Sequence, residues 1–139
     1  MLKGVPKLLS PELIKALCEM GHGDELVIAD ANFPCNSVNA HVIRADGIKG
    51  TDMLNAILDV IPTDTYVDSN IMLMKTINGD PTPEIWKEYE QIAKKDKDAK
   101  VSKIERPDFY KKAEKAYLVI ATGEERIYAN VIVRKGVIK

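Results

Sequence analysis

The chain has 139 residues, which suits one compact domain with a sizeable core and leaves little room for a second. Its 20 basic and 21 acidic residues nearly cancel, so we expect no nucleic-acid partner and no binding to an anionic membrane. No apolar run approaches the roughly 20 residues of a membrane helix, and the N-terminus lacks the long apolar region of a signal peptide.

The first expected elements are a helix over residues 10–20 and a strand over 26–29. The helix opens with an N-cap serine and a proline, and its apolar residues recur on one stripe. We expect Gly21 to end it in the left-handed conformation that glycine adopts at no steric cost. The strand is a short apolar run, typical of burial on both faces. Asp30 follows its carboxyl end, where open α/β sheets usually bind ligands, although exposed turns also favour aspartate there.

His22 lies between two glycines, and two interpretations of it stay open. Polar residues are common at a helix C-terminus, where a partly protonated imidazole is stabilised by the helix dipole, and spacing alone favours this reading. Imidazole also both gives and takes a proton near neutrality, and flanking glycines let a substrate approach. An extended strand from Leu26 to Asp30 spans roughly 13 Å. His22 and Asp30 therefore cannot contact each other directly. They would either bind opposite sides of a small polyol or meet across two subunits.

The middle of the chain alternates strand and helix patterns. Phe33 lies in the first loop, where it either faces a sugar or packs into the core. The expected elements are a loop over 31–37, a strand over 38–44, a threonine-capped helix over 51–61, a strand over 70–77, a turn over 78–82, an amphipathic helix over 83–95 and a strand over 101–104.

The last third predicts a helix from Pro107, a strand over 117–121, a turn over 122–126 and a strand over 127–133. Arg106 is left just outside the positive end of the helix, as a rim charge or as a residue held for a ligand. Tyr128 and Asn130 lie two apart, so we expect them on one face of the last strand, either exposed or forming a binding wall. Together the patterns predict a single-domain, three-layer α/β/α fold with a mixed β-sheet.

Eight short motifs in order carry a resemblance to a known family. The motifs are Ser10-Pro-Glu-Leu13, Glu19-Met-Gly-His-Gly-Asp-Glu25, Asp30-Ala31 with Phe33-Pro34, Val42-Ile-Arg-Ala-Asp-Gly47, Phe109-Tyr110, Thr122-Gly-Glu124, Tyr128 with Asn130, and Lys135-Gly-Val137. With these motifs the chain resembles the small sugar mutarotases of the RbsD/FucU family nearly end to end, with poor matching only from Asp64 to Lys100.

This resemblance implies a cofactor-independent isomerase, with no metal, that interconverts the α and β anomers of a monosaccharide. The ribose-type branch of the family tends to carry histidine where this chain has Arg106, so the expected sugar is L-fucose. The family forms rings, commonly decamers, which implies a homo-oligomer. Two cysteines without disulfide or zinc spacing favour the cytoplasm. The implied site residues are His22 as the catalytic acid/base and Asp30, Arg106, Tyr128, Ala129 and Asn130 as substrate contacts.

In this hypothesis His22 moves the proton at the ring or anomeric oxygen. Asp30 accepts hydrogen bonds from sugar hydroxyls, and Arg106 donates to sugar oxygens. Tyr128 is either a second proton-transfer partner or a simple donor. Two alternatives stay open: a ribose-type pyranase that uses the same ring opening, and a non-catalytic sugar-binding module associated with sugar uptake.

Overall fold

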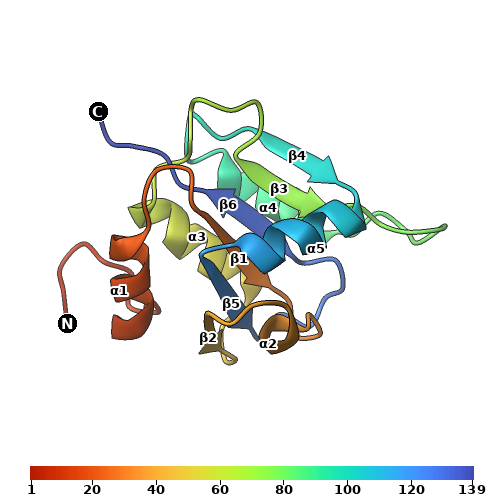
Figure 1. Cartoon of the computed structure of the whole chain (residues 1–139), viewed down its shortest axis with the longest axis horizontal. Helices are drawn as coiled ribbons and strands as arrows, with labels where there is room; N and C mark the ends of the chain where they lie inside the picture. The colour runs from red at the N-terminus through yellow and green to blue at the C-terminus, as the bar shows by residue number, and fades with distance from the viewer.

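The computed structural model describes residues 1–139 as a six-stranded mixed sheet between two layers of helices (Figure 1). The strand order is β2-β5-β1-β6-β3-β4, and β6 alone runs antiparallel to its neighbours. The elements are α1 (Pro11–Glu19), β1 (Glu25–Ala29), α2 (Cys35–Val38), β2 (Val42–Ala45), α3 (Gly50–Val60), β3 (Ile71–Met74), α4 (Ile85–Ala93), β4 (Val101–Ile104), α5 (Arg106–Lys115), β5 (Leu118–Thr122) and β6 (Val131–Arg134).

Each face of the sheet carries its own hydrophobic core. Residues of α1, α3 and α4 pack on one face, and those of α2 and α5 pack on the other, in front of the sheet in Figure 1. β1 serves both cores because successive side chains point to opposite faces: Leu26 and Ile28 join the first core, Val27 and Ala29 the second. The predicted fold class and the double burial of this strand are thus confirmed.

The C-terminal end of α1 differs from the expectation for Gly21. Met20 already leaves the helix in an extended conformation, and its N–H still bonds to the Ala16 carbonyl. The left-handed residue is Gly23, with φ of 86°. A Cβ atom at Gly23 would lie 3.1 Å from the Arg134 guanidinium. Glycine is therefore needed at Gly23, after His22, and not where the helix ends.

Two further expectations for the first half of the chain were wrong. The segment 31–37 is not all loop, since α2 occupies its end and carries Val38, which was expected in a strand. The expected threonine cap at Thr51 is also absent, because α3 begins one residue earlier, at Gly50, and no side chain caps it.

The predicted strand over 127–133 is shorter than expected. β6 begins only at Val131, and the residues before it form a loop in which Tyr128 has a φ of 58°. Tyr128 and Asn130 therefore do not share a strand face. No helix in the structure is both long and apolar enough to cross a bilayer.

Candidate functional site

A polar cavity of about 240 Å³ lies at the edge of the sheet where β1 and β3 end. The start of α5 and the loop before β6 close it, because β6 runs against the other strands and begins at this edge. Pockets for drug-sized ligands have volumes of roughly 300–1,000 Å³, so this smaller cavity suits a smaller molecule. The lining residues are Asp30, Asn32, Phe33, Met74, Asp80, Arg106, Tyr110, Ile127, Tyr128 and Asn130.

Asp30 lines this cavity and is buried, and hydrogen bonds hold both its backbone and its carboxylate. Its backbone N–H donates to Oδ1 of Asn130 over 2.8 Å, and Nδ2 of Asn130 donates to its carboxylate over 3.0 Å. The Asn32 N–H donates to the other carboxylate oxygen over 3.0 Å. Burial raises the pKa of Asp30 above 3.8, although these hydrogen bonds oppose the rise. Asp30 is thus a fixed acceptor whose orientation depends on Asn130.

Arg106 supplies a cation that no acid neutralises. It is the first residue of α5, one position earlier than expected for the helix start, and its guanidinium carbon lies 5.4 Å from the centre of the Tyr110 ring. Its side chain makes no hydrogen bond or ion pair within the chain, and it borders the same cavity as Asp30. Its donors are therefore available to a ligand in that cavity.

Tyr128 adds a phenol to the wall of the cavity. Its hydroxyl donates to the carboxylate of Asp80, and the hydroxyl oxygen accepts from the Ile77 N–H over 3.3 Å. The hydrogen bond to Asp80 raises the pKa of Tyr128, so the phenol keeps its proton near neutral pH. Ala129 does not line the cavity, because its side chain is buried in the core beneath α3 and α4.

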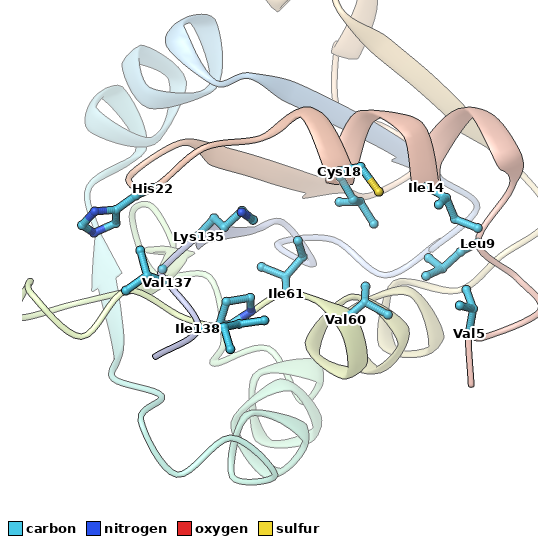
Figure 2. A pocket seen from close by; sticks show the side chains of 13 residues that line it. Val5, Leu9, Ile14, Cys18, His22, Val60, Ile61, Lys135, Val137 and Ile138 are labelled. Atoms are coloured by element: carbon cyan, nitrogen blue, oxygen red, sulfur yellow. The ribbon is translucent and has the colours of Figure 1, made fainter. Parts of the chain in front are cut away.

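His22 lies at the opposite edge of the sheet. It borders an apolar groove of about 570 Å³ between α1, the end of α3 and the C-terminal segment (Figure 2). Its side chain is 44% exposed, and Nε2 lies 3.0 Å from Oδ1 of Asp64. The Tyr66 ring lies 5.4 Å from the imidazole at an angle of 52°. One face of the histidine is thus held by protein while the rest is open to solvent.

Asp64 is fully buried and fixes His22 through a small network. Arg134 Nε donates to its second oxygen over 2.8 Å, and the Tyr66 N–H donates over 3.0 Å. Burial alone would raise the pKa of Asp64, but Arg134, the Tyr66 N–H and His22 outweigh it and lower the pKa to about 2. Asp64 is therefore charged at neutral pH and favours a proton on the facing imidazole nitrogen.

The structure brings together four of the six predicted site residues in one chain: Asp30, Arg106, Tyr128 and Asn130. His22 is not among them, because β1 separates it from Asp30, as its spacing required. Sequence reasoning missed Asp64 and Asp80. Asp80 belongs to an Asn-Gly-Asp-Pro turn pattern that explains it without function, and no local signal links Asp64 to a histidine 42 residues away. No group of three or more His, Cys, Asp or Glu side chains is arranged to hold a metal ion.

Comparison with known proteins gives consistent matches along the chain. The sequence model of the RbsD / FucU transport protein family matches residues 3–138. The chain is 48% identical to the human fucose mutarotase, over 99% of this chain and 94% of that protein. It is 44% identical to the L-fucose mutarotase of Haemophilus influenzae, over 99% and 97%. The crystal structure of the Streptococcus pneumoniae fucose mutarotase in complex with L-fucose has a TM-score of 0.94 at 45% identity, covering 99% of this chain and 100% of that one.

Proposed function

The chain belongs to the RbsD / FucU transport protein family, and from that premise we propose that it is an L-fucose mutarotase, an isomerase that interconverts the α and β anomers of L-fucose. Relatives with 44–48% identity over nearly its whole length carry that name, and a solved relative with a TM-score of 0.94 is described in complex with L-fucose. Residues 1–139 then form one mutarotase domain.

The cavity at the end of β1 carries this proposal. It combines a buried carboxylate, an unpaired guanidinium and a phenol in a volume of about 240 Å³. Asp30 would accept hydrogen bonds from sugar hydroxyls, and Arg106 would donate to sugar oxygens. Phe33 and Tyr110, whose rings stack on each other with centres 5.2 Å apart, also line the cavity and supply apolar surface for the C–H side of a sugar. A small polyol uses all of these groups at once.

Anomer exchange needs proton transfers and little else. The anomeric hydroxyl loses a proton, the ring oxygen gains one, the freed aldehyde rotates and the ring closes again. We assign the transfer at the ring or anomeric oxygen to His22, whose Nε2 faces Asp64 and whose other nitrogen is free to exchange a proton with substrate. The hydroxyl proton of Tyr128 points to Asp80 in the free chain, so Tyr128 either turns this proton from Asp80 to the sugar or relays the second proton.

His22 and the cavity lie at opposite edges of one sheet, so a site that needs both takes them from two copies of the chain. Exposed apolar side chains border both places: Val137 and Ile138 line the groove beside His22, and Ile127 lines the cavity. Contact between two different patches is heterologous, and it closes into a ring when the rotation allows. A ring-shaped homo-oligomer follows, with the decamer of the family as its expected size. Cys18 and Cys35 are both free, which suits the cytoplasm.

NMR saturation transfer between the two anomers of L-fucose tests the proposal. We expect the wild-type protein to accelerate the exchange and His22→Ala to lower the catalysed rate by about 10²- to 10⁴-fold. His41→Ala is the matched control, because the imidazole of this second histidine hydrogen-bonds only to the Tyr117 carbonyl and lines neither the cavity nor the groove.

The same measurement with D-ribose decides between the branches of the family. A faster catalysed exchange with ribose would contradict the choice of fucose. A protein that binds L-fucose and leaves its exchange at the buffer rate would be a sugar-binding module, and the assignment of an isomerase would be wrong.

A further inference from the structure

The loop that carries Tyr128 is held from behind by two side chains of α4. The indole N–H of Trp86 donates to the Tyr128 carbonyl over 3.3 Å. The hydroxyl of Tyr89, one helical turn later, donates to the Ala129 carbonyl over 2.9 Å. Both donors are buried on the face of the sheet that carries α1, α3 and α4, and neither residue lines the cavity. Two successive backbone carbonyls of the loop thus accept hydrogen bonds from side chains of one helix.

The loop needs such support because its backbone is strained. Tyr128 has a φ of 58°, a left-handed conformation that is unfavourable for a residue with a Cβ atom. This turn lets the loop cross the sheet edge: the Tyr128 ring packs against the core beneath α5, while the next side chain, Ala129, enters the core beneath α4. Asn130 then reaches Asp30. Strained residues persist only where their surroundings over-determine them.

The hydroxyl of Tyr89 has little freedom to move. The side chain is 1% exposed, and α3 approaches it through Gly50. A Cβ atom at Gly50 would lie 2.2 Å from that hydroxyl oxygen, so only glycine leaves room for it there. The hydroxyl therefore sits between Gly50 and the Ala129 carbonyl, with its donor direction fixed by packing.

We propose that Trp86 and Tyr89 are positioning residues of the sugar site, which hold Tyr128 and Asn130 in place from the opposite face of the sheet through hydrogen bonds to the loop backbone. This rests on the proposed function, because it assumes that L-fucose occupies the cavity. Binding there then changes the environment of Trp86 although the indole does not border the cavity.

Tyr89→Phe removes one hydroxyl and leaves the ring. We expect the KM for L-fucose to rise roughly threefold to tenfold, the effect of losing one buried hydrogen bond, with kcat falling less. Tyr117→Phe is the matched control, because the Tyr117 hydroxyl makes no hydrogen bond and its ring lies beside His41, away from the cavity. A Tyr89→Phe protein with a lowered melting temperature and an unchanged KM would make the hydroxyl merely structural and overturn the proposal.

Gly50→Ala displaces the hydroxyl without removing it. Its added methyl group should raise the KM at least as much as Tyr89→Phe does. In the Tyr89→Phe background the same methyl group meets no hydroxyl, so Gly50→Ala should add little further change. Full additivity of the two substitutions would mean that Gly50 acts by another route and would count against the proposal.

Trp86 is the only tryptophan, so its indole N–H gives a single NMR signal. Titration with L-fucose should shift this signal together with the side-chain amide signals of Asn130, which report binding in the cavity itself. A shift of the Asn130 signals alone overturns the positioning role and leaves the proposed function intact. If neither signal moves at saturating L-fucose, the proposed function fails first.

Discussion

The Nε2 atom of His22 lies 3.0 Å from a carboxylate oxygen of Asp64, a residue 42 positions further along the chain. The carboxylate is itself fixed by Arg134 and by the Tyr66 N–H. A histidine held in this way has a defined ring orientation and a preferred tautomer, with its proton on Nε2 and a free acceptor at Nδ1. Orientation of the imidazole thus depends on a buried acid outside the cavity.

Asp64→Asn tests this dependence. The amide keeps the size of the side chain and loses its charge, so the hydrogen bond that orients the imidazole of His22 is weakened. We expect the catalysed exchange of L-fucose anomers to fall roughly tenfold to a hundredfold, less than the loss expected for removing the acid–base group itself, because His22 is still present. Saturation transfer measures the rate, and Asp68→Asn is the control, because Asp68 is exposed and makes no ion pair. A wild-type rate in Asp64→Asn would remove Asp64 from the mechanism.

The free energy of unfolding should decrease in acid as Asp64 takes up a proton. Its pKa is about 2 in the folded chain and 3.8 in an unfolded one, so the folded state binds fewer protons. The stabilisation is complete above about pH 4 and is lost as the pH falls through 2. Between about pH 5 and pH 2, the free energy of urea unfolding should decline less for Asp64→Asn than for the wild type. Parallel curves would contradict the assignment.

Mixed assembly tests whether two copies share a site. His22→Ala and Asp30→Asn chains should each form nearly inactive assemblies. Co-expressed and co-purified, they should recover roughly a quarter of the wild-type rate, because that share of neighbouring pairs combines an intact histidine with an intact cavity. Asp30→Asn mixed with Arg106→Ala is the control: both changes lie in one cavity, so no pairing restores it. Failure of the first mixture to recover activity would confine the site to one chain.

Binding of L-fucose should weaken in mild acid because of Asp30. Burial raises the pKa of this carboxyl group above 3.8, and the protonated form loses an acceptor for sugar hydroxyls. The dissociation constant should therefore increase as the pH falls, with a midpoint above 3.8. Calorimetric titrations over a series of pH values measure it. Asp30→Asn should bind weakly at every pH, and a pH dependence that persists in this variant would assign the titration to another group.

Arg106→His exchanges the cation for the residue of the ribose-type branch. Loss of charge-assisted hydrogen bonds to the sugar should weaken L-fucose handling by roughly tenfold to a hundredfold. D-ribose handling should fall less, so the preference between the two sugars narrows. Exchange rates with both sugars on one preparation give the ratio directly. An unchanged ratio would separate Arg106 from sugar choice.

The local patterns of the sequence predicted most of the fold because they report burial. The run at β1 and the stripes of α1 and α4 are visible without coordinates, and their cores form as expected. The loop at Tyr128 was mistaken for a strand because its residues alternate like one. What holds that loop is a pair of donors on α4, about 40 residues away, and alternation carries no trace of them.

The sequence predicted which types of side chain form the site, but only part of their arrangement in space. Asp30 follows the carboxyl end of a buried strand, where open α/β sheets usually bind ligands, and its side chain lines the cavity. Arg106 joined it because β4 leads directly into α5 at the same sheet edge. Asp64 and Asp80 stayed hidden, because each gains its role from a side chain that approaches from a distant element.

The reversed direction of β6 ties the two edges of the sheet together. Asn130, just before this strand, fixes Asp30 at one edge, and Arg134, its last residue, fixes Asp64 at the other. The four residues of β6 therefore set the distance between the loop at the cavity and the carboxylate that orients His22. Inserting or deleting one residue there would turn every following side chain to the wrong face and misplace one of the two anchors.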